Sequence, residues 1–152
     1  MDTRKLQIEQ LERRIKFFAE AQKLPNPPTG WIKAVRLALG MTLQQLASKL
    51  TITNQSAREL EIREKEGTIT LKTLREAAQA LDMDLVYGLV PKDGSLDNYI
   101  DKKAREMAKK IVNRTSTTMK LEDQENTQER IQKAIETRTE DIKQSLPKAL
   151  WD

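Results

Sequence analysis

The stretch 41-MTLQQLASKLTITNQSAREL-60 has the pattern of two short helices joined by a tight turn. Thr42 precedes the first helix, and its hydroxyl is placed to accept one of the unpaired N–H groups of the first turn. Apolar residues then recur at steps of three, one and three, which is one helical face: Leu43, Leu46, Ala47 and Leu50. The pattern stops at Thr51-Ile52-Thr53, and Thr53 is placed to cap the second helix.

The second helix is expected to bury Ala57 and Leu60, with Ile52 added from the turn. Its first two turns are polar, and the candidate base-reading residues are Asn54, Gln55, Ser56 and Arg58. Amides match the edge of adenine and guanidinium matches that of guanine, so this helix suits a DNA major groove. The alternative is a short helical hairpin with no role in DNA binding.

This stretch resembles the helix-turn-helix of the Xre and phage-repressor family, over about Trp31 to Leu89. The matching residues are Leu46-Ala47, Ile52-Thr53, Asn54-Gln55-Ser56 and Leu60-Glu61. The resemblance implies DNA binding. One position departs from the family, which usually has glycine at the turn, where φ is positive, whereas this chain has Thr51. Either the turn differs slightly or the register is shifted by one residue.

The net charge is only +4, but no acidic residue occurs from Leu24 to Arg58. An acid-free window around a helix-turn-helix is typical of a phosphate-facing surface. Phosphate contacts are expected from three cations and from two helix N-termini. These residues are Lys33, Arg36, Lys49, Thr42 and Thr53. Glu59 could accept from a cytosine amino group or pair with Arg63, and pairing is preferred.

The composition excludes several other kinds of site. The chain has no Cys and no His, so no disulfide and no thiolate or imidazole metal site is expected. No motif indicates a cofactor, and an enzyme is the weakest of the functional classes. There is no signal peptide and no apolar run long enough to cross a bilayer, so we expect no membrane contact and a cytoplasmic location.

The remaining pattern predicts a mainly α-helical fold. Residues 1–24 form an N-terminal helix whose narrow seam would pack on its own domain or on a partner subunit. The seam is Ile8, Leu11, Ile15 and Phe18. Three prolines, Pro25, Pro27 and Pro28, then mark a boundary before a DNA-binding domain at 29–91. Its first helix, Trp31 to Leu39, would turn Ile32, Val35 and Leu39 inward and Lys33 and Arg36 outward. Trp31 is expected in the core, and the alternative for it is an exposed groove contact.

The segment before Pro91, 85-LVYGLV-90, is rich in β-forming residues and predicts a strand. No other segment is a suitable β partner, so we expect the strand to pair with that of a second copy in a homodimer. The dimer residues would be Leu85, Val86, Tyr87, Leu89 and Val90. The alternative is an extended stretch packed on its own core.

The C-terminal extension, 92–152, predicts two further helical segments. Within 97–113, one face gathers Ile100, Ala104, Met107, Ala108 and Ile111. Residues 114–124 have the composition of a linker. The last seam is sparse (Ile131, Ile135, Ile142 and Leu146), so it must dock on something or stay partly unfolded. Residues 122–141 hold seven acids against three bases, so this end is expected to face a protein rather than DNA.

Three pieces of the chain also resemble the bacterial family called mobile mystery protein A. They are Leu85 to Pro91, Arg114 to Met119 with Leu121 to Gln124, and Leu150-Trp151-Asp152. Members of that family typically lie beside a gene for a Fic-domain protein. The resemblance implies a toxin–antitoxin-like pair in which this chain, as a dimer on operator DNA, represses the shared promoter. The alternative function is a protein-binding antitoxin or adaptor that restrains a Fic-domain partner, with the helix-turn-helix as scaffold.

Overall fold

The computed structural model describes residues 3–116 and 124–152. By its contacts the chain divides into a central unit, Glu20–Gly88, and a terminal unit, Met1–Ala19 with Leu89–Asp152. The domain boundaries expected from the sequence, 1–24, 29–91 and 92–152, remain predictions. Among the described residues, no helix combines the length and the apolar character that crossing a membrane requires.

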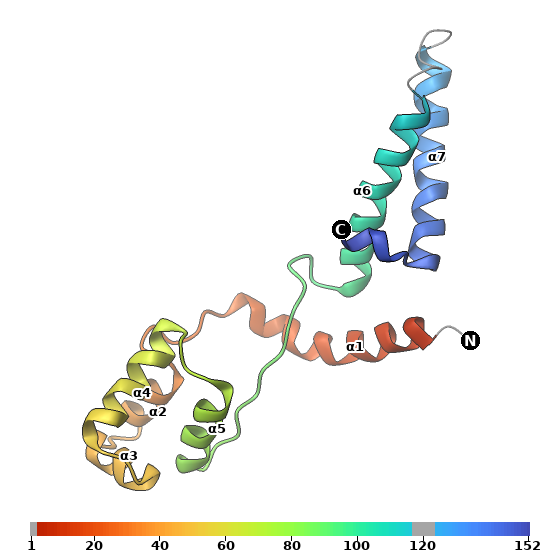
Figure 1. Ribbon diagram of the computed structural model, residues 1–152. Coiled ribbons are helices and arrows are strands. Elements are labelled where there is room, and N and C mark those ends of the chain that lie inside the picture. The colour runs from red at the N-terminus through yellow and green to blue at the C-terminus, as the bar shows by residue number, and fades with distance from the viewer. Residues whose placement is uncertain (1–2, 117–123) are drawn as a thin grey trace. The chain divides into compact units, whose positions relative to one another are not determined.

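The central unit begins with a short 3-10 helix, η1 (Glu20–Lys23), and continues with four α-helices (Figure 1). These are α2 (Trp31–Ala38), α3 (Leu43–Leu50), α4 (Asn54–Glu66) and α5 (Leu71–Ala80). They enclose one small core made of Ile32, Leu46, Leu60, Ala77 and Leu81. The core confirms the inward face predicted for the helix-turn-helix. α5 packs against α3 and completes this core with Ala77, and Leu81 follows directly after α5.

Threonine caps define where three of these helices begin. The hydroxyls of Thr42, Thr53 and Thr70 each accept a hydrogen bond of 3.1 Å from the N–H three residues further on. At Thr42 the cap is reciprocal, because the side chain of Gln45 accepts from the Thr42 N–H at 2.8 Å. The predicted capping roles of Thr42 and Thr53 are therefore confirmed.

Thr51 occupies the left-handed conformation that the family usually gives to glycine. Its φ is 57° and its ψ is 43°. The chain reverses there, and the Ile52 N–H donates to the Ala47 carbonyl at 3.0 Å. The predicted register is thus right, and a β-branched residue adopts a conformation that costs about 1–2 kcal/mol relative to the usual helical region.

Two inward predictions for α2 are wrong. Trp31 is 55% exposed because it stands at the first position of the helix, beyond the edge of the core. Leu39 is 61% exposed because the helix ends at Ala38 and Gly40 turns the chain with a φ of 68°. The other two apolar positions, Ile32 and Val35, pack in the core as predicted.

Residues 83–90 form neither helix nor strand in the described chain. Val86 and Tyr87 are 71% and 60% exposed, whereas Leu85 is half-buried. Leu85 and Val86 border an apolar cavity that residues of α2 and α5 also line. No strand is found among the described residues. The predicted strand, which requires a second copy, therefore remains a prediction.

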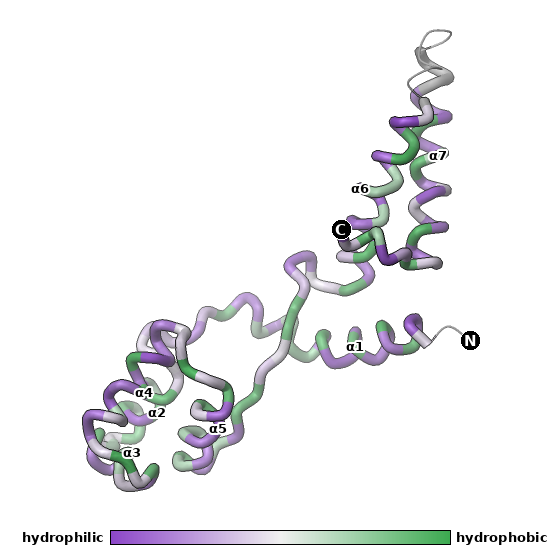
Figure 2. Tube along the Cα trace, in the orientation of Figure 1, coloured by the Kyte–Doolittle hydropathy of each residue, from purple (hydrophilic) through white to green (hydrophobic). Residues whose placement is uncertain are grey.

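The terminal unit is built on an antiparallel hairpin of two long helices, α6 (Leu96–Ser116) and α7 (Gln124–Ser145), followed by the short 3-10 helix η2 (Lys148–Trp151) (Figure 1). Hydrophobic positions recur among hydrophilic ones along both long helices (Figure 2). They form a second core made of Ala104, Ala108, Val112, Ile135, Ile142 and Leu150. The sparse C-terminal seam thus docks on the face predicted for residues 97–113.

Two features of this hairpin were not predicted from the sequence, the full length of its helices and a ring contact at its base. Residues 114–116 continue α6 and Gln124 begins α7, so the linker interpretation is wrong at these positions. Positions 117–123 of that segment lie outside the described residues. At the base of the hairpin, Tyr99 of α6 stacks on Trp151 of η2 with ring centroids 5.6 Å apart.

The first helix, α1 (Thr3–Ala19), has no fully buried residue, and three of its four predicted seam residues, Ile8, Ile15 and Phe18, are half-buried. Two polar contacts join it to the hairpin. The Glu12 carboxylate accepts from the Leu96 N–H at the start of α6. The Arg4 guanidinium donates to the Leu146 carbonyl, just after α7, at 2.9 Å. Both contacts suit the helix dipole, because a carboxylate is stabilised near a helix N-terminus and a cation near a helix C-terminus.

Candidate nucleic-acid interface

The candidate interface is built on the crossing of α3 and α4. At the crossing Leu46, Ala47 and Ala57 are 0%, 3% and 0% exposed. Two of these residues are alanines, so the helix backbones approach closely and the outer face of α4 is held at a fixed angle. Ile52 is 36% exposed and contributes less to this packing than predicted.

All four candidate base-reading residues lie on the exposed first two turns of α4. In the part of the chain that the structure describes, no hydrogen bond or ion pair involves the side chains of Asn54, Gln55 or Arg58. Ser56 differs, because its hydroxyl accepts from the Thr53 hydroxyl at 3.0 Å and so belongs to the helix cap. The arrangement leaves two amides and one guanidinium available on one helix end.

Four of the candidate phosphate contacts are accessible. Thr42, Lys49 and Thr53 are exposed, and Lys33 of α2 is half-buried. Thr42 and Lys49 border a wide polar hollow of about 800 Å³ beside α3. Gln44 and Ser48 border the same hollow and were missed by the sequence reasoning. Their i,i+4 spacing on the polar side of α3 was the available signal.

Arg36 is the clear correction, because it points into the protein and is only 7% exposed. Its Nε and Nη2 donate to the two oxygens of Glu61 at 2.7 and 3.0 Å, and Nη1 donates to the Met41 carbonyl at 3.0 Å. The hydrogen bond with Glu61 raises the pKa of Arg36 above its ordinary value, against the opposing effect of burial. Arg36 therefore joins α2 to α4 and leaves the set of phosphate contacts.

Glu64 of α4 is a second anchor that the sequence reasoning missed. Its two oxygens accept from the N–H groups of Trp31 and Ile32 at 2.7 and 2.8 Å, so it caps α2 from another helix. The ordinary cap position of α2 is Gly30, which has a φ of 88°. A Cβ at Gly30 would stand 3.0 Å from the Glu64 carboxylate, so the cap requires glycine there.

These contacts also determine the charge of the outer face of α4. Glu61 and Glu64 both turn toward α2, where a guanidinium and a helix N-terminus meet their charges. Glu59 pairs with Arg63 at 3.8 Å, which confirms the preferred pairing. Glu61 and Glu64 are thus engaged with α2, whereas Glu59 stays exposed beside Arg58 in a surface pair with Arg63.

The comparison with protein families agrees with this geometry. Residues 32–87 match the family model described as Helix-turn-helix. The match supports an Xre-type helix-turn-helix domain, the class of DNA-binding transcriptional regulators. Searches of the curated proteins and of the solved structures found no match to the chain.

Proposed function

We propose that the chain is a sequence-specific regulator that reads an operator through the first two turns of α4. One observation carries the proposal: Asn54, Gln55 and Arg58 are exposed and have no partner within the described residues. The opposite face of their helix is held to α2 by the buried ion pair of Glu61. A rigid helix with available amides and guanidinium suits direct readout, where a good bidentate contact is worth about 1–3 kcal/mol of discrimination. Ser56 stands at their side and supports the cap.

The phosphate contacts in this proposal come from two sources. Lys33 and Lys49 supply charge, and the N-termini of α3 and α4, at Thr42 and Thr53, supply backbone N–H groups. The engaged positions of Glu61 and Glu64 support the proposal, because both carboxylates turn toward α2 and leave Glu59, which pairs with Arg63, as the acid next to the proposed reading residues.

The working form that we propose is a homodimer paired through residues 85–90. The exposure of Val86 and Tyr87 supports this, since apolar side chains on an unpaired extended segment favour pairing with another strand. A two-fold dimer would place two α4 helices on successive major grooves, about 34 Å apart.

The genes controlled are proposed from the resemblance to mobile mystery protein A. We propose that the chain represses its own promoter in an operon shared with a Fic-domain protein. The alternative, direct restraint of that protein with the helix-turn-helix as scaffold, finds support in the hairpin, which belongs to a different compact unit from the helix-turn-helix.

The test is fluorescence-anisotropy binding of the full chain to the DNA just upstream of its own gene, against scrambled DNA, across a salt series. Autorepression predicts tight binding to the upstream DNA, a large ratio over scrambled DNA, and affinity that falls steeply with salt. Equal and weak binding to both DNAs would contradict the proposal. A parallel titration with the purified Fic-domain protein would then distinguish the scaffold alternative.

A further inference from the structure

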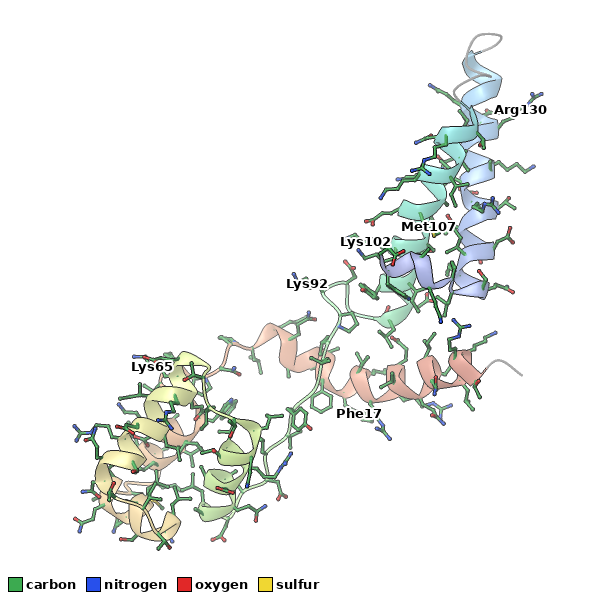
Figure 3. The ribbon with its side chains drawn as sticks, in the orientation of Figure 1. Phe17, Lys65, Lys92, Lys102, Met107 and Arg130 are labelled. Atoms are coloured by element: carbon green, nitrogen blue, oxygen red, sulfur yellow. The ribbon has the colours of Figure 1, made fainter. Side chains whose placement is uncertain are left out.

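An open groove lies between the two helices of the terminal unit, towards the end of the hairpin away from η2. Its volume is about 550 Å³. Its floor is apolar and comes from both helices: Ile111 and Val112 of α6, and Ala134 of α7. Its rim carries three cations of α7, which are Arg130, Lys133 and Arg138. Arg130 extends outward from α7 in Figure 3.

The acidic and basic side chains of α7 are distributed unevenly around the helix, which its net charge does not show. Glu129, Glu136 and Glu140 are exposed and follow steps of seven and four residues, so they share one face of the helix. None of these three glutamates lines the groove, where Asp141 is the one acid among the lining residues described. The groove is therefore a local basic surface on a helix that carries many acids.

The three rim cations are not engaged within the described part of the chain. All three are exposed, and none forms an ion pair there. The fourth cation of the same stretch, Lys143, contrasts with them, because it pairs with Asp101 at 3.3 Å and with Glu140 at 3.8 Å. Within the described residues, the rim thus presents three cations that have no ion-pair partner.

The hydroxyls in the groove do not add free donors. Thr115 donates to the Val112 carbonyl at 2.9 Å, and Thr137 donates to the Lys133 carbonyl at 3.0 Å. What the groove offers a ligand is therefore an apolar floor between the two helices, bordered by three cations of α7.

We propose that this groove binds an acidic amphipathic segment of a partner protein. The apolar side chains of the segment would lie on Ile111, Val112 and Ala134, and its carboxylates would meet Arg130, Lys133 and Arg138. Amphipathic helices bind hydrophobic grooves in this way, and complementary charge determines which partner is accepted. A phosphate backbone fits less well, because the floor gives it only apolar contact. The proposal does not depend on DNA binding by α4.

The test uses the full chain and a fluorescein-labelled synthetic helix with leucine on one face and glutamate on the other. Binding is measured by anisotropy. The double variant Lys133→Glu, Arg138→Glu should weaken binding roughly tenfold or more, because two attractive contacts become repulsive. The control is Lys102→Glu, Lys110→Glu, which changes the net charge equally at exposed positions of α6 outside the groove lining. We expect it to retain nearly wild-type affinity.

A second peptide, in which serine replaces each leucine, tests the apolar floor and should bind at least tenfold more weakly. Equal binding of the two peptides, or an equal loss in the control variant, would overturn the proposal in favour of long-range charge attraction. Random-sequence duplex DNA is the competitor. If it displaces the peptide from a variant with Arg58→Ala as effectively as the unlabelled peptide does, the groove is a nucleic-acid surface and the proposal fails. Circular dichroism confirms that each variant is folded.

Discussion

Arg36 of α2 and Glu61 of α4 form a buried, bidentate ion pair, with Nε–Oε2 at 2.7 Å and Nη2–Oε1 at 3.0 Å. The side chains are 9% and 6% exposed. Because Arg36 also donates to the Met41 carbonyl, the pair joins α2, α4 and the connection that leads to α3. A residue that the charge pattern assigned to the DNA surface thus holds together the unit that presents that surface.

Removing one member of this pair should destabilise the chain strongly. Glu61→Gln or Arg36→Met leaves a buried charge without its partner, and we expect a loss of about 3–5 kcal/mol in the free energy of unfolding. Urea denaturation followed by circular dichroism measures it. The double variant Arg36→Met, Glu61→Leu should recover much of the loss, since neither charge is then buried alone. A double variant as unstable as the sum of the single ones would contradict this account.

Thr51→Gly should stabilise the central unit. The substitution removes the strain of a β-branched residue at a φ of 57°, and the greater freedom of glycine in the unfolded chain offsets part of the gain. We expect a net gain of about 0.5–1 kcal/mol by urea denaturation. Thr53→Ala, in the same turn, is the contrasting variant and should lose about 1 kcal/mol with its cap. A destabilised Thr51→Gly variant would mean that contacts of the Thr51 side chain outweigh the strain.

The local signals in the sequence predicted the central unit well. The caps at Thr42 and Thr53 and the apolar steps between Leu43 and Leu50 act over a few residues. They therefore located α3, the turn and α4. The left-handed residue could also be located, although its identity as Thr51 made the register uncertain.

Contacts between distant residues could not be predicted in the same way. Arg36 and Glu61 are 25 residues apart, and Glu64 is 33 residues from Trp31, so no periodicity links them. An arginine on a polar face was reasonably expected to be exposed, and burial with a partner reversed that expectation. The hairpin could be predicted in part. Its thin second seam indicated a need for a partner surface, but only the packing identifies α6 as that surface.

Replacing the proposed base-reading residues should weaken operator binding without unfolding the chain. Gln55→Ala or Arg58→Ala should each lose about 1–3 kcal/mol on the specific site and much less on scrambled DNA. Anisotropy titrations on both DNAs measure the difference. Lys65→Ala is the matched control for Arg58→Ala, since it removes one exposed cation further along α4. Unchanged discrimination in the Gln55 and Arg58 variants would rule out this reading face.

Val86→Pro should abolish the proposed dimer. Proline cannot donate to a ladder of hydrogen bonds between strands, and Val86 lies inside the segment expected to pair. The folded core should be little affected, because Val86 is 71% exposed in the single chain. Light scattering gives the mass of each variant, and Val86→Thr, which retains a β-branched donor, is the control. An intact Val86→Pro dimer would discard the strand model.

The cap that Glu64 provides also bears on the order in which the central unit folds. α2 has only eight residues and no side-chain cap of its own, so in isolation it would barely be populated. Its first N–H groups find their acceptor on α4, which follows much later in the chain. A growing or refolding chain would therefore form α3 and α4 first and add α2 onto them. Amide hydrogen exchange in α2 should accordingly depend on α4 being folded, so the first α-helix of the unit in sequence gains protection only after α4 has formed.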